Sequence, residues 1–179
     1  MNRRQRKQRQ QLRASLELDF RGLRGVAWRL TSKSTNRYNC FAWADRVKRC
    51  RFDVVDGWWP NNIARDDSIE TLVLMYESRG YVRCSEEDAK TFDTAYETIV
   101  LYSRDKTIDG GLPTERIIHE GTHAARLLPN GQWTSKLGPD QDISHPTPEC
   151  LNGRFYGEAL DYMRKKRRAS VKTKSKPAR

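Results

Sequence analysis

Residues 122–138 read THAARLLPNGQWTSKLG, and the local structure of this stretch decides both the fold and the chemistry of the chain. Asn130 and Gly131 form the dipeptide most typical of a tight β-hairpin turn, and a possible strand lies on either side of it. A two-residue turn predicts that position 128 faces position 133 and that His123 faces Gly138. The alternation of side chains along a strand then gives one shared face to His123, Ala125, Leu127, Thr134, Lys136 and Gly138.

A competing interpretation comes from residues 119–123, which read HEGTH and fit the H-E-x-x-H pattern of zinc peptidases. On a helix, His119 and His123 lie one turn apart and can bind one zinc ion, while Glu120 acts as general base. A third ligand would come from further along the chain: His145, Glu149 or Glu158. A helix would also place Gly121 in its interior, at a cost of ~1 kcal/mol relative to alanine. The hairpin signal favours a strand, so a zinc hydrolase is the alternative.

Cys40 is the candidate nucleophile. Asn39 occupies an N-cap position, and the apolar spacing of residues 40–49 predicts a helix with Cys40 in its first turn, facing inward. A helix N-terminus and a nearby imidazole both lower the pKa of a thiol. His123 is the candidate base, because a fold can bring together residues that are far apart in sequence. The alternative is that an inward-facing cysteine is simply a small core residue.

The base needs a hydrogen-bond acceptor for its second ring nitrogen. His145 is the first candidate for this third catalytic position, followed by Asp140 and Asp142. Asn39 or the backbone amide of Cys40 could donate to an oxyanion.

The remaining patterns place this candidate site within an α+β domain. Ser68 caps a second helix that ends near Gly80. Residues 81–83 and 98–103 are expected to be strands, and residues 153–163 are either a strand or a short helix. We therefore expect N-terminal helices packed on a small antiparallel sheet, with a cleft between helix and sheet.

The net charge of +11 comes from the two ends of the chain. Residues 1–14 hold six of the 34 basic side chains and residues 164–179 hold nine, which leaves 19 basic against 23 acidic residues in between. The domain is therefore expected at residues 17–163, between disordered basic tails at 1–16 and 164–179. Such tails could bind nucleic acid or an anionic surface, so a non-enzymatic nucleic-acid-binding protein is a second alternative.

The sequence predicts a cytoplasmic location. No apolar segment follows the basic start, and no stretch approaches the ~20 apolar residues that span a bilayer. Four cysteines without an export signal are expected to be reduced thiols, and the absence of a C-x-x-C pair argues against zinc ribbons and thioredoxin-type sites. No cofactor and no metal is expected for the thiol mechanism.

The short motifs occur in a characteristic order: NRYNCFAWA (residues 36–44), THAARLL (122–128), GQWTSKLG (131–138), DISH (142–145) and Tyr156-Gly157. Together they resemble an uncharacterised family of small bacterial domains, over about residues 35–163, and that family resembles the NlpC/P60 and papain-like cysteine hydrolases. The resemblance implies a papain-like fold with Cys40 as nucleophile, His123 as base and His145 as third member. NlpC/P60 enzymes usually carry the third polar residue on the strand directly after the histidine, where this chain has Ser135 and Lys136.

Overall fold

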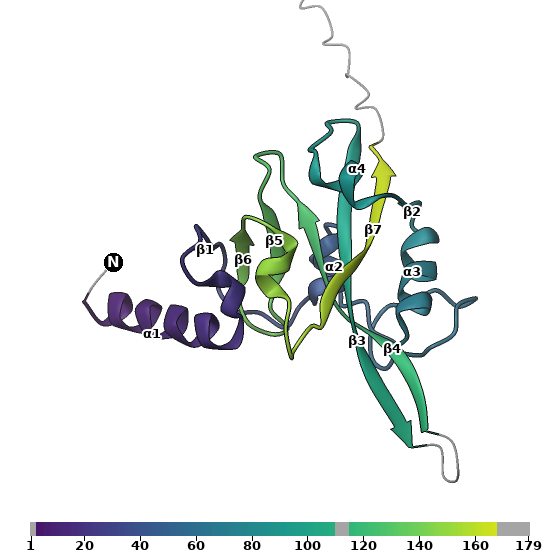
Figure 1. Cartoon of the computed structure of the whole chain (residues 1–179), viewed down its shortest axis with the longest axis horizontal. Helices are drawn as coiled ribbons and strands as arrows, with labels where there is room; N and C mark the ends of the chain where they lie inside the picture. The colour runs from purple at the N-terminus through teal and green to yellow at the C-terminus, as the bar shows by residue number, and fades with distance from the viewer. Residues whose placement is uncertain (1–2, 110–114, 168–179) are drawn as a thin grey trace, which may run out of the picture.

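The computed structural model describes residues 3–109 and 115–167 of the chain. Its seven strands form one antiparallel sheet in the order β1-β6-β5-β4-β3-β7-β2 (Figure 1). In chain order they are β1 (Arg29–Leu30), β2 (Val82–Arg83), β3 (Tyr96–Asp109), β4 (Glu115–Leu127), β5 (Trp133–Lys136), β6 (Asp142–His145) and β7 (Glu158–Lys166). The helices are α1 (Arg3–Asp19), η1 (Arg21–Leu23), α2 (Cys40–Ala44), α3 (Ile69–Glu77), α4 (Glu86–Lys90) and η2 (Pro148–Leu151). The predicted α+β class with an antiparallel sheet is confirmed.

Two apolar clusters cover the two faces of the sheet. On β3, Ile99 and Leu101 belong to the cluster that includes α2 and α3, and we call this side the α2 face. Val100 and Tyr102 belong to the cluster that includes η1 and η2, and we call this side the η2 face. The switch at every residue follows from the pleat of a strand, in which successive side chains point to opposite sides.

The two predicted helix caps are confirmed. The side chain of Asn39 accepts a hydrogen bond from the Ala42 amide at 3.1 Å, and that of Ser68 accepts from the Thr71 amide at 3.2 Å. However, α2 has only five residues and ends at Ala44, well before the predicted end at residue 49. The segment left open at residues 153–163 contains the start of a strand, β7.

The predicted hairpin exists, but its register differs by one residue from the expectation. Leu127 pairs with Trp133 and Ala125 pairs with Ser135, around a three-residue turn. Pro129 explains the difference, because a two-residue turn would need a backbone N–H at position 129 and proline has none. Instead the Leu128 amide donates to the Gln132 carbonyl at 2.7 Å, and Gly131 adopts a φ of 76°. A shift of one residue exchanges the faces of a strand, so Ser135, rather than Thr134 or Lys136, shares the side of Ala125.

The first basic segment is a helix rather than the disordered tail expected from its composition. Leu16 in α1 is buried on the η2 face, and the Arg13 guanidinium lies 4.0 Å from the centre of the Trp28 ring. The Arg13 side chain also donates to the Trp28 carbonyl at 3.1 Å. The other expected tail begins inside β7, and residues 168–179 lie outside the described residues. Among the helices that the structure describes, none has both the length and the apolar character needed to cross a bilayer.

Candidate active site

Cys40 is the first residue of α2 and lies against β4. Its side chain is buried, with 7% of the residue exposed. Burial raises the pKa of the thiol to about 11, although the backbone amides of Ala124, Phe41 and Cys40 itself oppose this shift by hydrogen bonding to the sulfur. The thiol is therefore protonated at neutral pH in this arrangement.

Lys136 places a buried positive charge near that thiol. The residue is fully buried, and its ammonium donates to the carbonyls of Gly138, at 2.8 Å, and Asp140. It also lies 5.6 Å from the centre of the Tyr38 ring on the α2 face. Burial lowers the pKa of Lys136, and its charge favours the thiolate form of Cys40. The sequence placed Lys136 on the predicted hairpin but gave no sign of its burial.

His123 lies on β4 opposite Tyr102 of β3 and is fully buried. Its ring stacks on Tyr156, with centroids 3.9 Å apart and planes 8° from parallel, and meets the Tyr102 ring edge-on at 5.2 Å. Among the described residues, neither ring nitrogen of His123 has a hydrogen-bond partner. Burial lowers the pKa of His123 well below its usual value, and the charge of His145 adds to this effect. The imidazole is therefore neutral, with both nitrogens unused.

The structure brings Cys40 and His123 to the same short stretch of β4 but does not join them by a hydrogen bond. Ala124 packs on the α2 face, so its neighbour His123 points to the η2 face. Tyr156 stacks on His123, and the pKa of its phenol is raised by burial and then by the negative charge of the Cys40 thiolate. The pairing of β4 with β5 ends close by, at Ala125 and Ser135.

His145, the expected third member, belongs to a separate network on the η2 face. Its Nδ1 donates to the Thr147 carbonyl at 2.8 Å, and therefore its Nε2 accepts from the Ser135 hydroxyl at 2.9 Å. Burial lowers the pKa of His145 to about 4. Both ring nitrogens are thus occupied, and neither bonds to His123.

The two carboxylates considered as substitutes are also placed elsewhere. Asp142 accepts a hydrogen bond from the Tyr38 hydroxyl at 2.9 Å, and Asp140 is exposed. Neither of them bonds to the His123 ring.

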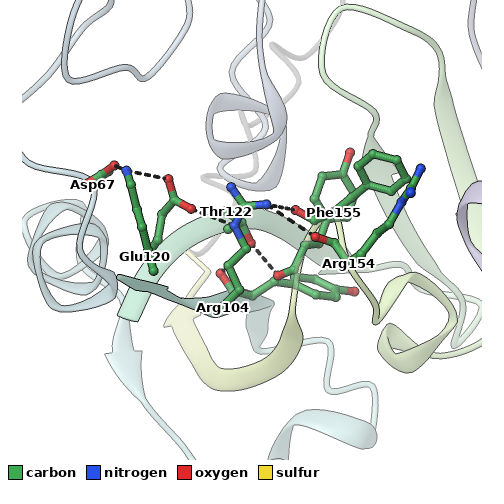
Figure 2. A network of polar contacts seen from close by, with 9 residues as sticks. Asp67, Arg104, Glu120, Thr122, Arg154 and Phe155 are labelled. Carbon is green, nitrogen blue, oxygen red and sulfur yellow. Dashed lines mark hydrogen bonds and ion pairs between the residues drawn. The ribbon is translucent and has the colours of Figure 1, made fainter. Parts of the chain in front are cut away.

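A polar network holds in place the loop that carries Tyr156 (Figure 2). The Thr122 hydroxyl donates to the Tyr156 carbonyl at 2.5 Å, and the Arg104 guanidinium approaches the carbonyls of Arg154 and Phe155 at 3.4 and 3.5 Å. Arg104 is itself paired with Glu120 at 2.7 Å. The end of the loop is equally confined, because a Cβ at Gly157 would lie 1.8 Å from the Ser103 carbonyl oxygen. These contacts fix the position of Tyr156 over His123. The sequence showed Tyr156-Gly157 only as a motif and did not indicate this position.

The H-E-x-x-H segment lies on β4, so the helix that this zinc motif requires is absent. His119 is exposed and lies 2.8 Å from Asp105, while Glu120 pairs with Arg104 and with Lys106. Within residues 3–109 and 115–167, no group of three or more His, Cys, Asp or Glu side chains is placed to hold a metal ion.

A comparison with known protein families matches residues 29–164 to the model of a domain of unknown function, DUF7689. No curated protein and no solved structure matches the chain significantly. The matched span covers most of the chain and both sides of the candidate site, and therefore the chain belongs to the DUF7689 family.

Proposed function

We propose that this member of the DUF7689 family is a thiol-dependent hydrolase or acyltransferase that acts on an amide or related acyl bond. Cys40 is the nucleophile and His123 the base, in a domain distantly related to the papain-like and NlpC/P60 hydrolases. The support is the order of the sequence motifs, a cysteine that begins a capped helix, and a histidine on the strand against which that helix packs.

The observation that carries this proposal is the His123 ring. Nearly all buried polar groups in proteins are hydrogen-bonded, because an unpaired one keeps its desolvation cost without compensation. His123 is fully buried with two unpaired ring nitrogens, directly before the residue whose amide contacts Cys40. The unfavourable burial of these unpaired nitrogens is explained if the imidazole acquires a hydrogen-bond partner during the reaction, either the thiol or the substrate.

The pKa directions favour a neutral pair over a preformed thiolate and imidazolium. Burial raises the pKa of Cys40 to about 11 and lowers that of His123. The proton would then move as the sulfur attacks: Cys40 Sγ bonds to the acyl carbon while His123 takes the thiol proton. His123 returns that proton to the leaving amine as the carbon–nitrogen bond breaks, which leaves a thioester on Cys40. Water or another nucleophile then cleaves the thioester and regenerates the thiol.

Two further groups would stabilise negative charge during the proposed reaction. The Lys136 ammonium stabilises negative charge as it develops on the sulfur. The side-chain amide of Asn39 already donates to the Phe52 carbonyl at 2.6 Å, so the oxyanion donor in this proposal is the backbone amide of Cys40, which contacts the reacting sulfur itself. Because the Tyr156 ring covers His123, a substrate reaches the pair only after that ring moves aside.

A small activated ester tests the proposal without knowledge of the natural substrate. Incubation with p-nitrophenyl acetate should acetylate Cys40, as seen by peptide mapping, and should release p-nitrophenolate. Cys40→Ser should abolish both signals. Cys150→Ser is the matched control, because Cys150 is also buried, at 5% exposure, and should leave both unchanged.

The variant His123→Phe keeps an aromatic ring against Tyr156 and removes the base. We expect it to slow the acetylation of Cys40 by about 100-fold or more, the usual contribution of a general base. Acetylation at the same rate in this variant, or acetylation that avoids Cys40, would contradict the proposal.

A further inference from the structure

Three arginines converge on a small cavity away from Cys40. Arg46 follows α2, Arg126 lies on β4, and Arg167 follows β7. They line a cavity of about 80 Å³ with Glu97, Thr98 and the turn residues Leu128 and Pro129. A cavity of that volume can hold several waters, or one group of similar size.

Arg126 is the informative member of this cluster. Its guanidinium lies 4.3 Å from the centre of the Trp43 ring, and its Nε is buried without a hydrogen-bond partner among the described residues. The structure also gives Arg126 no ion pair within residues 3–109 and 115–167. An arginine offers five donors in a fixed fork, so one left unpaired at a cavity wall is prepared for an external acceptor.

The charges around the cavity leave it positive. Glu97 is the acidic side chain on its wall, and it pairs with Arg46 at 3.3 Å and with Lys165 at 3.6 Å. Glu97 is therefore shared between two cations and cannot neutralise all three arginines. Burial lowers the pKa of Arg126 to about 10, and the positive charge of Arg46 contributes. Two guanidinium groups that repel each other in a partly buried cavity are stabilised when an anion lies between them.

We infer that Arg46, Arg126 and Arg167 form a binding site for the terminal phosphate group of a small molecule. Planar guanidinium groups bind phosphate oxygens in pairs of parallel hydrogen bonds, and three of them can surround one phosphate. The site lies apart from Cys40 and His123 and does not depend on thiol chemistry.

The surroundings of the cavity favour a phosphate at the end of a molecule over the continuous backbone of a nucleic acid. The inner wall includes Thr98 and Leu127, which are each 6% exposed, so the phosphate would enter a closed end. A larger hollow of about 870 Å³ adjoins the cavity and shares Arg46, Glu97 and Arg167 with it. The remainder of the ligand would lie there, beside Ser78, Arg79, Lys165 and Lys166.

Calorimetric titration with inorganic phosphate and with adenosine monophosphate, at constant ionic strength set by chloride, tests this inference. Both should bind the intact protein with one site per chain. Arg126→Gln should weaken binding by about tenfold or more, because it removes charge-assisted hydrogen bonds. Arg83→Gln is the matched control: it removes the same charge from the same sheet at an exposed ion pair with Asp161, and should bind as the unchanged protein does.

Arg46→Gln provides a second variant whose folding is less at risk, since 53% of the Arg46 side chain is exposed. It should also weaken binding. The inference is overturned if neither phosphate nor adenosine monophosphate binds saturably, or if both arginine variants bind like the control. It is equally overturned if single-stranded DNA binds while the two small ligands do not.

Discussion

His123 and His145 are both fully buried on the η2 face, yet their hydrogen bonding is opposite. His145 uses both ring nitrogens, one toward the Thr147 carbonyl and one toward the Ser135 hydroxyl. His123 uses neither, and is held by ring contacts with Tyr102 and Tyr156. His145 therefore has the contacts of a structural residue, and His123 those of a residue that lacks a partner in the resting molecule.

The difference arises from the strands that flank each histidine. β5 and β6 pair closely, so that Ser135 of β5 lies on the same face as His145 and within reach of it. β4 pairs with β5 from Ala125 onward, so His123 lies before that pairing begins, and the Tyr156 ring stacks on it. An apolar neighbour holds an imidazole in place but cannot satisfy its nitrogens. On this one face of the sheet, His145 therefore stabilises the fold, whereas His123 is the histidine available for chemistry.

The largest expected effect is on stability, from replacing each histidine with phenylalanine. His145→Phe leaves the Thr147 carbonyl and the Ser135 hydroxyl without their partner, and should lower the free energy of unfolding by about 2–4 kcal/mol. His123→Phe keeps the stack on Tyr156 and removes two unpaired nitrogens, and should change that free energy by less than about 1 kcal/mol. Urea denaturation at pH 7 measures both. Equal losses in the two variants would remove the distinction between the histidines.

A pH series should detect the buried neutral state of His145. Its pKa is about 4 in the folded chain against 6.5 when unperturbed. Between those values the unfolded chain takes up a proton that the folded chain does not, so stability is complete above pH 6.5 and falls as the pH falls toward 4. At pH 5 this residue should account for a loss of about 2 kcal/mol relative to pH 7. Between pH 7 and pH 5, the free energy of unfolding of His145→Phe should fall by about 2 kcal/mol less than that of the unchanged protein. If it falls equally in both proteins, His145 is not buried as a neutral ring.

A smaller effect is expected at the turn that sets the hairpin register. Gly131 has a φ of 76°, a conformation that an L-alanine adopts at a cost of about 1 kcal/mol. Gly131→Ala should therefore lower the free energy of unfolding by about 1 kcal/mol, measured by urea denaturation. Gly25→Ala, at a φ of 72° in open space, should show a similar loss. A neutral Gly131→Ala would argue against the three-residue turn that places Ser135 beside His145.

Local patterns predicted local structure well. The capping side chains of Asn39 and Ser68 act within three residues of their own position, and both helices begin where the sequence indicates. The hairpin was also predicted, because its turn is encoded by consecutive residues. Its register was not, because the dipeptide Asn130-Gly131 points to a two-residue turn while Pro129 requires a longer one. That single residue changed the predicted neighbours of every side chain on β5.

The environment of each candidate site residue depends on segments that are distant in sequence. Cys40 and His123 were identified from spacing and from a family resemblance, but no local pattern indicates that Tyr156 lies on the His123 ring or that Lys136 is buried near the thiol. His145 was expected to orient His123, and its actual partners, Ser135 and Thr147, become visible only when β5 and β6 are paired. The helix α1 was also missed, since basic residues conceal the packing of Leu16 on the η2 face.

The pH dependence of Cys40 alkylation tests the central claim most directly. The pKa of the Cys40 thiol is about 11, so at lower pH iodoacetamide alkylates it only if a base removes the thiol proton as the sulfur attacks. If His123 accepts the thiol proton, the alkylation rate of Cys40 should rise with an apparent pKa below about 8.5, the value of a free cysteine, and His123→Phe should move it upward. An apparent pKa near 11 that is the same in the unchanged protein and in His123→Phe would show that thiol and imidazole do not act together.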